Sequence, residues 1–171
     1  MGANGKGRAA QTLNMLPETL ENQELAVAVQ AFDADAIQGG KFDRGELTLE
    51  IARGKIVSVC GFLKYDQKFV RLSTVTAVDR YPAEPRFEVV YHLHSVERNR
   101  RVRLKCRVAG AAPEIDSVTS VWCGANWYER EVFDLFGIRF QGHPELRRIM
   151  LPEDWEGHPL RRDVPVTGSR V

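Results

Sequence analysis

The sequence predicts an α+β fold: a mixed or mostly antiparallel sheet, helices packed on one side of it, and an extended C-terminal arm. Residues 86–96 and 100–108 alternate apolar and polar side chains, as strands do when one face of their sheet is buried. Residues 126–137 are typical of an amphipathic helix that ends in a glycine, and its apolar body is expected to comprise Trp127, Tyr128, Val132, Phe133 and Phe136. Beyond Gly137 a proline recurs every six to eight residues, a pattern that helix interiors and paired strands do not tolerate.

The N-terminal half supplies the first elements. Residues 17–32 are predicted to form a helix, because Pro17 suits a first helical position and acidic residues follow it. The stretch QGGKFDRGE, 38–46, is expected to be a loop. Residues 46–52 alternate as a strand, and residues 54–66 place apolar side chains at helical spacing.

A β-hairpin is the clearest local prediction. The alternating runs 86–96 and 100–108 are joined by the short polar link Glu-Arg-Asn. One face of the hairpin is expected to be buried and the other to be strongly basic, with Arg101, Arg103, Lys105 and Arg107 of the second strand. Residues 70–79 before the hairpin and 116–122 after it are predicted to be further strands.

We divide the chain into a flexible lead-in at 1–17, an α+β core domain at 18–137 and an extended proline-rich arm for partner docking at 138–171. The arm is too apolar for a free tail, so it is expected to lie on a surface, either of its own domain or of a partner. It contains two similar stretches, GHPELRR from Gly142 and GHPLRR from Gly157.

Composition excludes several classes of protein. The net charge of +1 gives no overall attraction to nucleic acid or anionic membranes. No run of 18 apolar residues is present and the N-terminus lacks an apolar signal core, so neither a membrane span nor export is expected. The scattered Cys60, Cys106 and Cys123 indicate a reducing compartment and argue against an iron–sulfur cluster.

Metal binding has little support. His92 and His94 point to the same side of a strand, but no carboxylate or cysteine pattern completes a ligand set, so a polar sheet face is favoured. His143 and His158 each precede a proline and lie far apart, so a shared metal is not expected.

Catalysis is also not expected. Glu129 and Glu131 are two residues apart on a helix and do not share a face, whereas Arg130 and Asp134 have the spacing of an ion pair. A charged helix face that docks or is solvated is therefore favoured, and we assign no catalytic residue.

The remaining hypothesis is an interaction protein. A nucleic-acid module is disfavoured because the basic strand has no aromatic stacking face. Arginines in the arm suit clamps on carboxylates or carbonyls, and Leu146, Trp155 and Leu160 suit pockets on a partner. Prolines lower the entropy cost of holding such an arm extended.

The helix and arm also resemble a known family. The signature of the 30-kDa subunit of respiratory complex I is similar to Glu-Arg-Glu from Glu129 and Asp-Leu-Phe from Asp134, followed after six residues by His143 and after three more by Arg147 with Ile149 and Met150. The continuation LPEDWEGHPLRRDVPV and the hairpin sequence are similar too, so the resemblance covers about Phe62 to Val166. Cys123 departs from it, where a proline is common.

The resemblance implies a cofactor-free structural or assembly subunit in the peripheral arm of a proton-translocating NADH:quinone oxidoreductase, on the cytoplasmic side of the bacterial inner membrane. FMN, iron–sulfur clusters and quinone belong to other subunits. The arm packs on the D subunit, of the 49-kDa type, which forms the quinone pocket with the B subunit. Membrane contact comes only through the complex. One alternative is the equivalent subunit of a related membrane-bound hydrogenase or other-donor dehydrogenase, and another is a phosphate- or RNA-binding module.

The residues expected at the partner interface are those of the family motif. They are Glu129, Arg130, Glu131, Asp134, His143, Pro144, Leu146, Arg147, Arg148, Trp155, His158, Pro159, Leu160, Arg161, Arg162 and Asp163.

Overall fold

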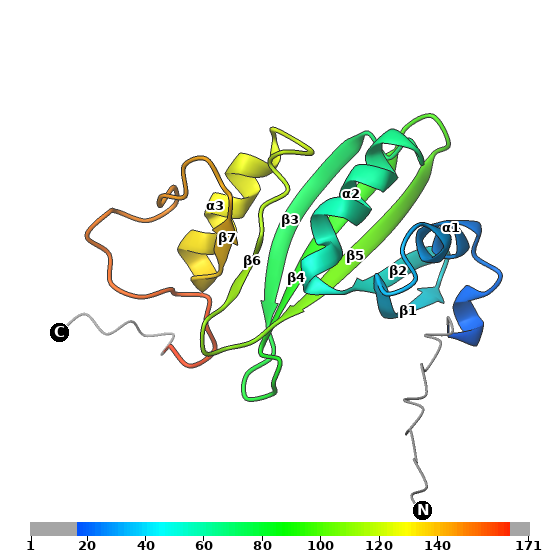
Figure 1. Ribbon diagram of the computed structural model, residues 1–171. Helices are drawn as coiled ribbons and strands as arrows, with labels where there is room; N and C mark the ends of the chain where they lie inside the picture. The colour runs from blue at the N-terminus through cyan, green and yellow to red at the C-terminus, as the bar shows by residue number, and fades with distance from the viewer. Residues whose placement is uncertain (1–16, 165–171) are drawn as a thin grey trace, which may run out of the picture.

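A computed structural model of the chain describes residues 17–164 (Figure 1). Apart from Pro17, the expected lead-in lies outside the described residues, as do the last residues of the arm, 165–171. The elements in chain order are η1 (Glu18–Leu20), α1 (Glu24–Phe32), β1 (Ile37–Asp43), β2 (Glu46–Ile51), η2 (Arg53–Lys55), α2 (Ile56–Tyr65), β3 (Arg71–Asp79), β4 (Phe87–Ser95), β5 (Arg100–Val108), β6 (Glu114–Asp116), α3 (Ala125–Phe136) and β7 (Arg139–Gln141).

The main sheet is mixed, as predicted. Its strand order is β1-β2-β5-β4-β3, with β2 and β5 parallel and the other neighbours antiparallel. Figure 1 shows α2 lying across one face of this sheet. Residues of α1, α2 and α3 form a single buried cluster with the inward-facing residues of the strands, so the helices share that face. This confirms the predicted α+β class.

The β4–β5 hairpin forms as predicted, with Tyr91 opposite Leu104. The face expected to be strongly basic is instead nearly balanced in charge. Its cations meet acids from neighbouring strands, in the pairs Arg103–Glu46 at 2.6 Å, Lys105–Glu88 at 2.8 Å and Arg107–Glu50 at 3.6 Å. Reading β5 alone missed the charges that sheet formation brings beside it.

The predicted helix over 17–32 is broken in two. A single 3-10 turn precedes α1, and Gln23 adopts an extended backbone between them. The cause is tertiary packing: Leu20 is fully buried against Gly40 of β1, which draws the first turn away from the axis of α1.

The stretch QGGKFDRGE is not the expected loop. It contains β1, which pairs antiparallel with β2 through a tight turn in which Arg44 and Gly45 have φ angles of 51° and 79°. Gly40 was misread as a loop residue, but a side chain there would collide with the backbone carbonyl oxygen of Thr48. The glycine permits close strand contact.

Two predictions around α3 also need correction. The strand expected over 116–122 is wrong except at Asp116, the last residue of β6, and the residues after it turn back toward α3. The arm, in turn, does not begin as unpaired chain: β7 pairs in parallel with β6, with Ile115 opposite Phe140. This short pairing precedes the first proline of the arm. The helix α3 itself is confirmed and ends at Gly137, whose φ is 73°.

Candidate functional site

The residues of the family motif gather where α3 meets the arm, here residues 142–164. Figure 1 shows the arm leaving β7 and running back beside α3. Its hydrogen bonds reach α3 and the end of β3, so the arm lies on its own domain. The sequence left open whether the arm lies on its own domain or on a partner, and in the free chain it lies on its own domain.

Asp134 is the main anchor of the arm. Its carboxylate is fully buried, and Oδ2 accepts the backbone N–H groups of Ile149, Met150 and Leu151 at 3.0, 2.8 and 2.9 Å. Arg148 donates to Oδ1 at 2.5 Å. Burial pushes the pKa of Asp134 upward, but these four donors outweigh it and hold the pKa below the usual range.

Arg130 does not form the expected pair with Asp134. It is buried, and its guanidinium donates to the backbone carbonyls of Arg147 at 3.2 Å and Arg148 at 3.3 Å. The same guanidinium lies 5.1 Å from the ring centre of Trp127, which is 61% exposed rather than part of the apolar body of the helix. The spacing allowed an ion pair within the helix, but the arm supplies better partners for both charges.

The second half of the arm caps the C-terminus of α3. The last carbonyls of a helix have no partner within it. Here His158 Nδ1 donates to the carbonyl of Asp134 at 2.8 Å, the Leu160 N–H to that of Leu135 at 3.1 Å, and Arg161 Nε to that of Phe136 at 2.7 Å. Cationic groups here also complement the negative end of the helix dipole.

The histidines of the two Gly-His-Pro stretches therefore make different backbone contacts. His143 Nδ1 accepts the N–H of Glu145, which leaves Nε2 to donate to the Asn126 carbonyl at 3.2 Å. His158 carries its proton on Nδ1 instead, because a carbonyl can only accept. Each imidazole is fixed on backbone, and among residues 17–164 no group of three or more His, Cys, Asp or Glu side chains could hold a metal ion.

Gly137 is required for this cap. A Cβ at Gly137 would meet the His158 ring at 2.5 Å and the Arg161 guanidinium at 2.6 Å, and the positive φ adds strain. We expect Gly137→Ala to lower the free energy of unfolding by about 3 kcal/mol and to expose the arm to protease. Gly142→Ala is the matched control, since Gly142 has a φ of 77° but no atom within 4 Å of its Cβ position.

In this comparison, Gly142→Ala measures only the cost of a side chain at positive φ, about 1 kcal/mol. Chemical unfolding and limited proteolysis of both variants provide the measurement. Equal losses in the two variants would contradict a steric role of Gly137 in seating the arm.

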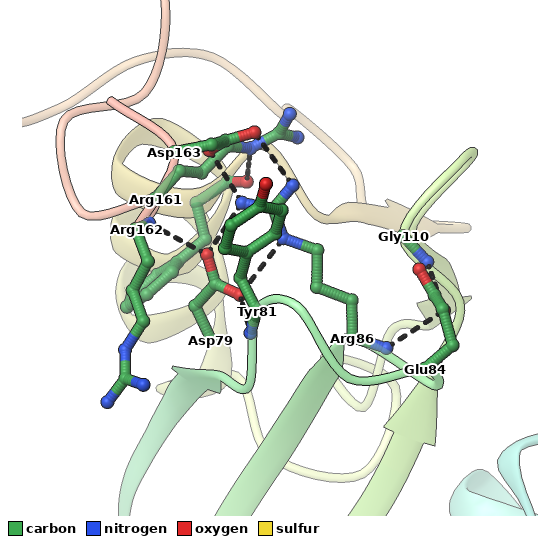
Figure 2. Close-up of polar contacts among 9 residues, drawn as sticks. Asp79, Tyr81, Glu84, Arg86, Gly110, Arg161, Arg162 and Asp163 are labelled. Atoms are coloured by element: carbon green, nitrogen blue, oxygen red, sulfur yellow. Dashed lines mark hydrogen bonds and ion pairs between the residues drawn. The ribbon is translucent and has the colours of Figure 1, made fainter. Parts of the chain in front are cut away.

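The end of the arm is fixed by a second network, at the edge of the main sheet (Figure 2). Arg86 donates to both carboxylate oxygens of Asp79, at 2.9 and 2.7 Å, and to both of Asp163, at 2.8 and 2.6 Å. The Arg162 N–H donates to Asp79 Oδ2 at 2.9 Å. Figure 2 shows the ring of Tyr81 beside this guanidinium, 5.0 Å from its centre to the Arg86 Cζ. Sequence reasoning missed Asp79 and Arg86, which lie 83 and 77 residues before the arm residues that they contact, Arg162 and Asp163.

Burial pushes the pKa of Asp79 upward, but hydrogen bonds from Arg86, Arg162 and Tyr81 outweigh it and lower the pKa to about 2. Asp79 therefore keeps its negative charge at neutral pH, and the hydrogen bonds that join the sheet to the arm persist there.

Glu129 faces the core rather than the surface. Its carboxylate accepts a hydrogen bond from Ser117 Oγ at 2.6 Å and from the Val118 N–H at 2.7 Å, and it is fully buried. Burial raises its pKa to about 7 despite these two donors. The prediction that the charged face of the helix docks or is solvated is thus wrong for Glu129, whereas Glu131 is exposed. Glu129 holds the β6–α3 connection in place.

The remaining motif residues divide by exposure. Leu146 packs on the core of its own domain, and Arg147 is exposed and pairs with Glu145 at 3.2 Å. Trp155 and Pro159 are partly exposed, whereas Pro144 and Arg162 are exposed. The large apolar side chains that α3 and the arm leave exposed by half or more are Trp127 at 61%, Met150 at 61% and Leu160 at 51%. These three side chains are the exposed apolar part of this site.

The chain matches a known protein family. The family model described as "Respiratory-chain NADH dehydrogenase, 30 Kd subunit" matches residues 49–170. The chain belongs to this family.

Curated members of the 30-kDa subunit family are close in sequence. The C subunit of NADH-quinone oxidoreductase from Geobacter sulfurreducens is 46% identical over 149 residues, covering 86% of this chain and 92% of the relative. The protein of the same name in Trichlorobacter lovleyi is 53% identical over 129 residues, covering 75% and 80% of the two chains.

Two solved structures share the fold. A trypsin-resistant fragment (1-134) of Nqo5 is 30% identical, with a TM-score of 0.62 over 71% of this chain and 98% of the fragment. A chain of the membrane-bound sulfane sulfur reductase, an archaeal respiratory membrane complex, is 28% identical with a TM-score of 0.72 and covers 82% and 83%. The fold therefore occurs in respiratory complexes with different names. Within residues 17–164, no helix has the length and apolar character needed to cross a bilayer.

Proposed function

We propose that this chain is the C subunit of a proton-translocating NADH:quinone oxidoreductase and acts as a structural and assembly subunit of its peripheral arm. The observation that carries the proposal is the 46% identity to the C subunit of NADH-quinone oxidoreductase over nearly the full length of both chains. The whole complex would transfer electrons from NADH to quinone and couple this to proton translocation.

In this proposal the chain contributes no catalytic residue and no cofactor. FMN, the iron–sulfur clusters and the quinone site belong to other subunits. The fixed tautomers of His143 and His158 and the carboxylates committed to backbone N–H groups support a structural role for the motif. The complex would hold the chain on the cytoplasmic side of the bacterial inner membrane.

The contact with the D subunit, near the B subunit, would be made by the outer surface of α3 and the arm. Hydrogen bonds to the domain hold the arm in place, so a partner meets a preformed surface and the entropy cost of ordering the arm is already met. Trp127, Met150 and Leu160 are the apolar anchors that this surface offers.

The test is recovery of the complex from gently solubilised membranes, with this chain tagged at its N-terminus. The wild-type chain should recover an assembly that contains clusters, oxidises NADH and reduces quinone. Trp127→Ala combined with Met150→Ala should lower that recovery about tenfold or more, because the loss of two central anchors costs several kcal/mol.

Val27→Ala with Val96→Ala is the matched control, since these side chains are 45% and 61% exposed on α1 and in the β4–β5 turn, on the side of the molecule away from α3. Equal loss in both pairs would contradict the assigned surface. A second candidate function, a subunit of a complex using another electron donor, is favoured by the likeness to the sulfane sulfur reductase chain. Recovery of an assembly that does not oxidise NADH would select it.

A further inference from the structure

A cavity of about 520 Å³ lies away from α3 and the arm, between the start of α1, the β1–β2 hairpin and the β4–β5 turn. The parallel pairing of β2 with β5, with Leu47 opposite Val102, brings the two hairpins together. In the view of Figure 1, α1 lies on one side of the molecule and α3 with the arm on the other. This cavity could therefore be filled while the arm surface is engaged.

The floor of the cavity is apolar. Leu47 and Phe69 are buried, while Phe42 also lines the cavity and is 43% exposed. The volume is within the range of protein binding sites, roughly 300–1,000 Å³. A bound apolar side chain would cover the open ring of Phe42, which is the usual way that an exposed aromatic residue contributes to binding.

The rim of the cavity is cationic. Arg98, Arg100 and Arg101 line it, and only Arg100 has an ion pair among the described residues, with Glu24 at 2.9 Å. Arg98 and Arg101 are exposed, and neither makes an ion pair within residues 17–164. Two uncompensated guanidiniums beside an apolar floor attract a ligand that carries both carboxylates and an apolar group.

The side-chain amides of the rim distinguish a peptide from a lipid. Asn22, Gln23, Gln67 and Asn99 line the same cavity. Each amide can both donate and accept, which matches the alternating N–H and C=O groups of a peptide backbone. An acyl chain would leave these amides without partners and would gain less from a cavity with so many polar groups.

We propose that this cavity is a second docking site, which binds an acidic peptide segment carrying an aromatic or aliphatic side chain, supplied by a partner protein. The apolar side chain rests on Phe42 and Phe69, and its neighbouring carboxylates pair with Arg98 and Arg101. The proposal does not depend on which electron donor the complex uses.

The test is a selection from a random peptide library displayed on phage, run on the full-length chain. Wild-type protein should enrich acidic sequences with an apolar residue. Arg98→Gln with Arg101→Gln should lower the affinity of the enriched peptides about tenfold, since two charge pairs are lost. Arg53→Gln with Arg139→Gln makes the same change in net charge at exposed positions outside the cavity and should leave the affinity unchanged.

Enrichment of the same sequences by both double variants, or no enrichment of acidic sequences by the wild type, would overturn the proposal. Vesicles of phosphatidylglycerol are the second probe. Vesicle binding that Arg98→Gln with Arg101→Gln abolishes, with no acidic peptide enriched, would assign the cavity to a lipid surface and would equally overturn the proposal.

Discussion

Asp134→Ala should release the arm from α3 and lower the free energy of unfolding by about 4 kcal/mol, because it leaves a partly buried Arg148 and three backbone N–H groups without their acceptor. The main sheet and its helices share a core cluster against which, of the described arm residues, only Leu146 packs, so the domain itself should remain folded. Protease should then cut within residues 142–163 while the strands stay protected.

Glu131→Ala is the control for this variant, since it removes a carboxylate from the exposed face of the same helix. Urea unfolding and limited proteolysis, followed by mass spectrometry of the fragments, give the two readouts. An arm that stays protected in Asp134→Ala would show that the backbone contacts of Arg130 and Arg161 suffice to hold it.

The second large effect concerns pH and Glu129. Its folded pKa of about 7 lies above the ordinary value of 4.5, so the folded state binds the proton more tightly than the unfolded state does. Stability from this group is complete below about pH 4.5 and is lost as pH rises toward 7, by up to about 3 kcal/mol. Glu129→Gln should match the wild type at acidic pH and exceed its stability by that amount above pH 7.

The neutral amide keeps both contacts, because its oxygen can accept from Val118 N–H and its NH₂ can donate to Ser117 Oγ. His143 and His158 oppose Glu129 over part of this range: burial lowers their pKa values, so their contribution rises with pH. Both proteins carry these histidines, so the difference between their free energies of unfolding at each pH removes the contribution of the histidines. Parallel stability curves from pH 4.5 to 8 would contradict the assignment.

The sequence predicted the elements whose apolar periodicity is local. The hairpin of β4 and β5, the strand β3, and the helices α2 and α3 follow from alternation or helical spacing within about ten residues. The break before α1 and the strand β1 were missed because both depend on Leu20 packing against Gly40, a contact that no local window contains.

For the candidate site, the motif identified the residues but not their partners. A spacing of four suggested Arg130 with Asp134, yet each meets the backbone of the arm. The expected anchor Leu146 serves its own core, whereas the exposed Trp127 was placed inside the helix packing. Spacing along a helix predicts which side chains are neighbours, but a third segment that supplies better acceptors or donors changes the pairing.

The way Asp134 holds the arm affects which substitutions the arm can accept. Its carboxylate accepts hydrogen bonds from the backbone N–H groups of residues 149–151 and from no side chain of those three. The side chain of Met150 is 61% exposed. At Met150, almost any residue except proline, which lacks the N–H, can therefore stand without loosening this contact, whereas Ile149 and Leu151 are partly buried. The arm can thus change the side chain that it presents to a partner at this position while its backbone stays attached to α3.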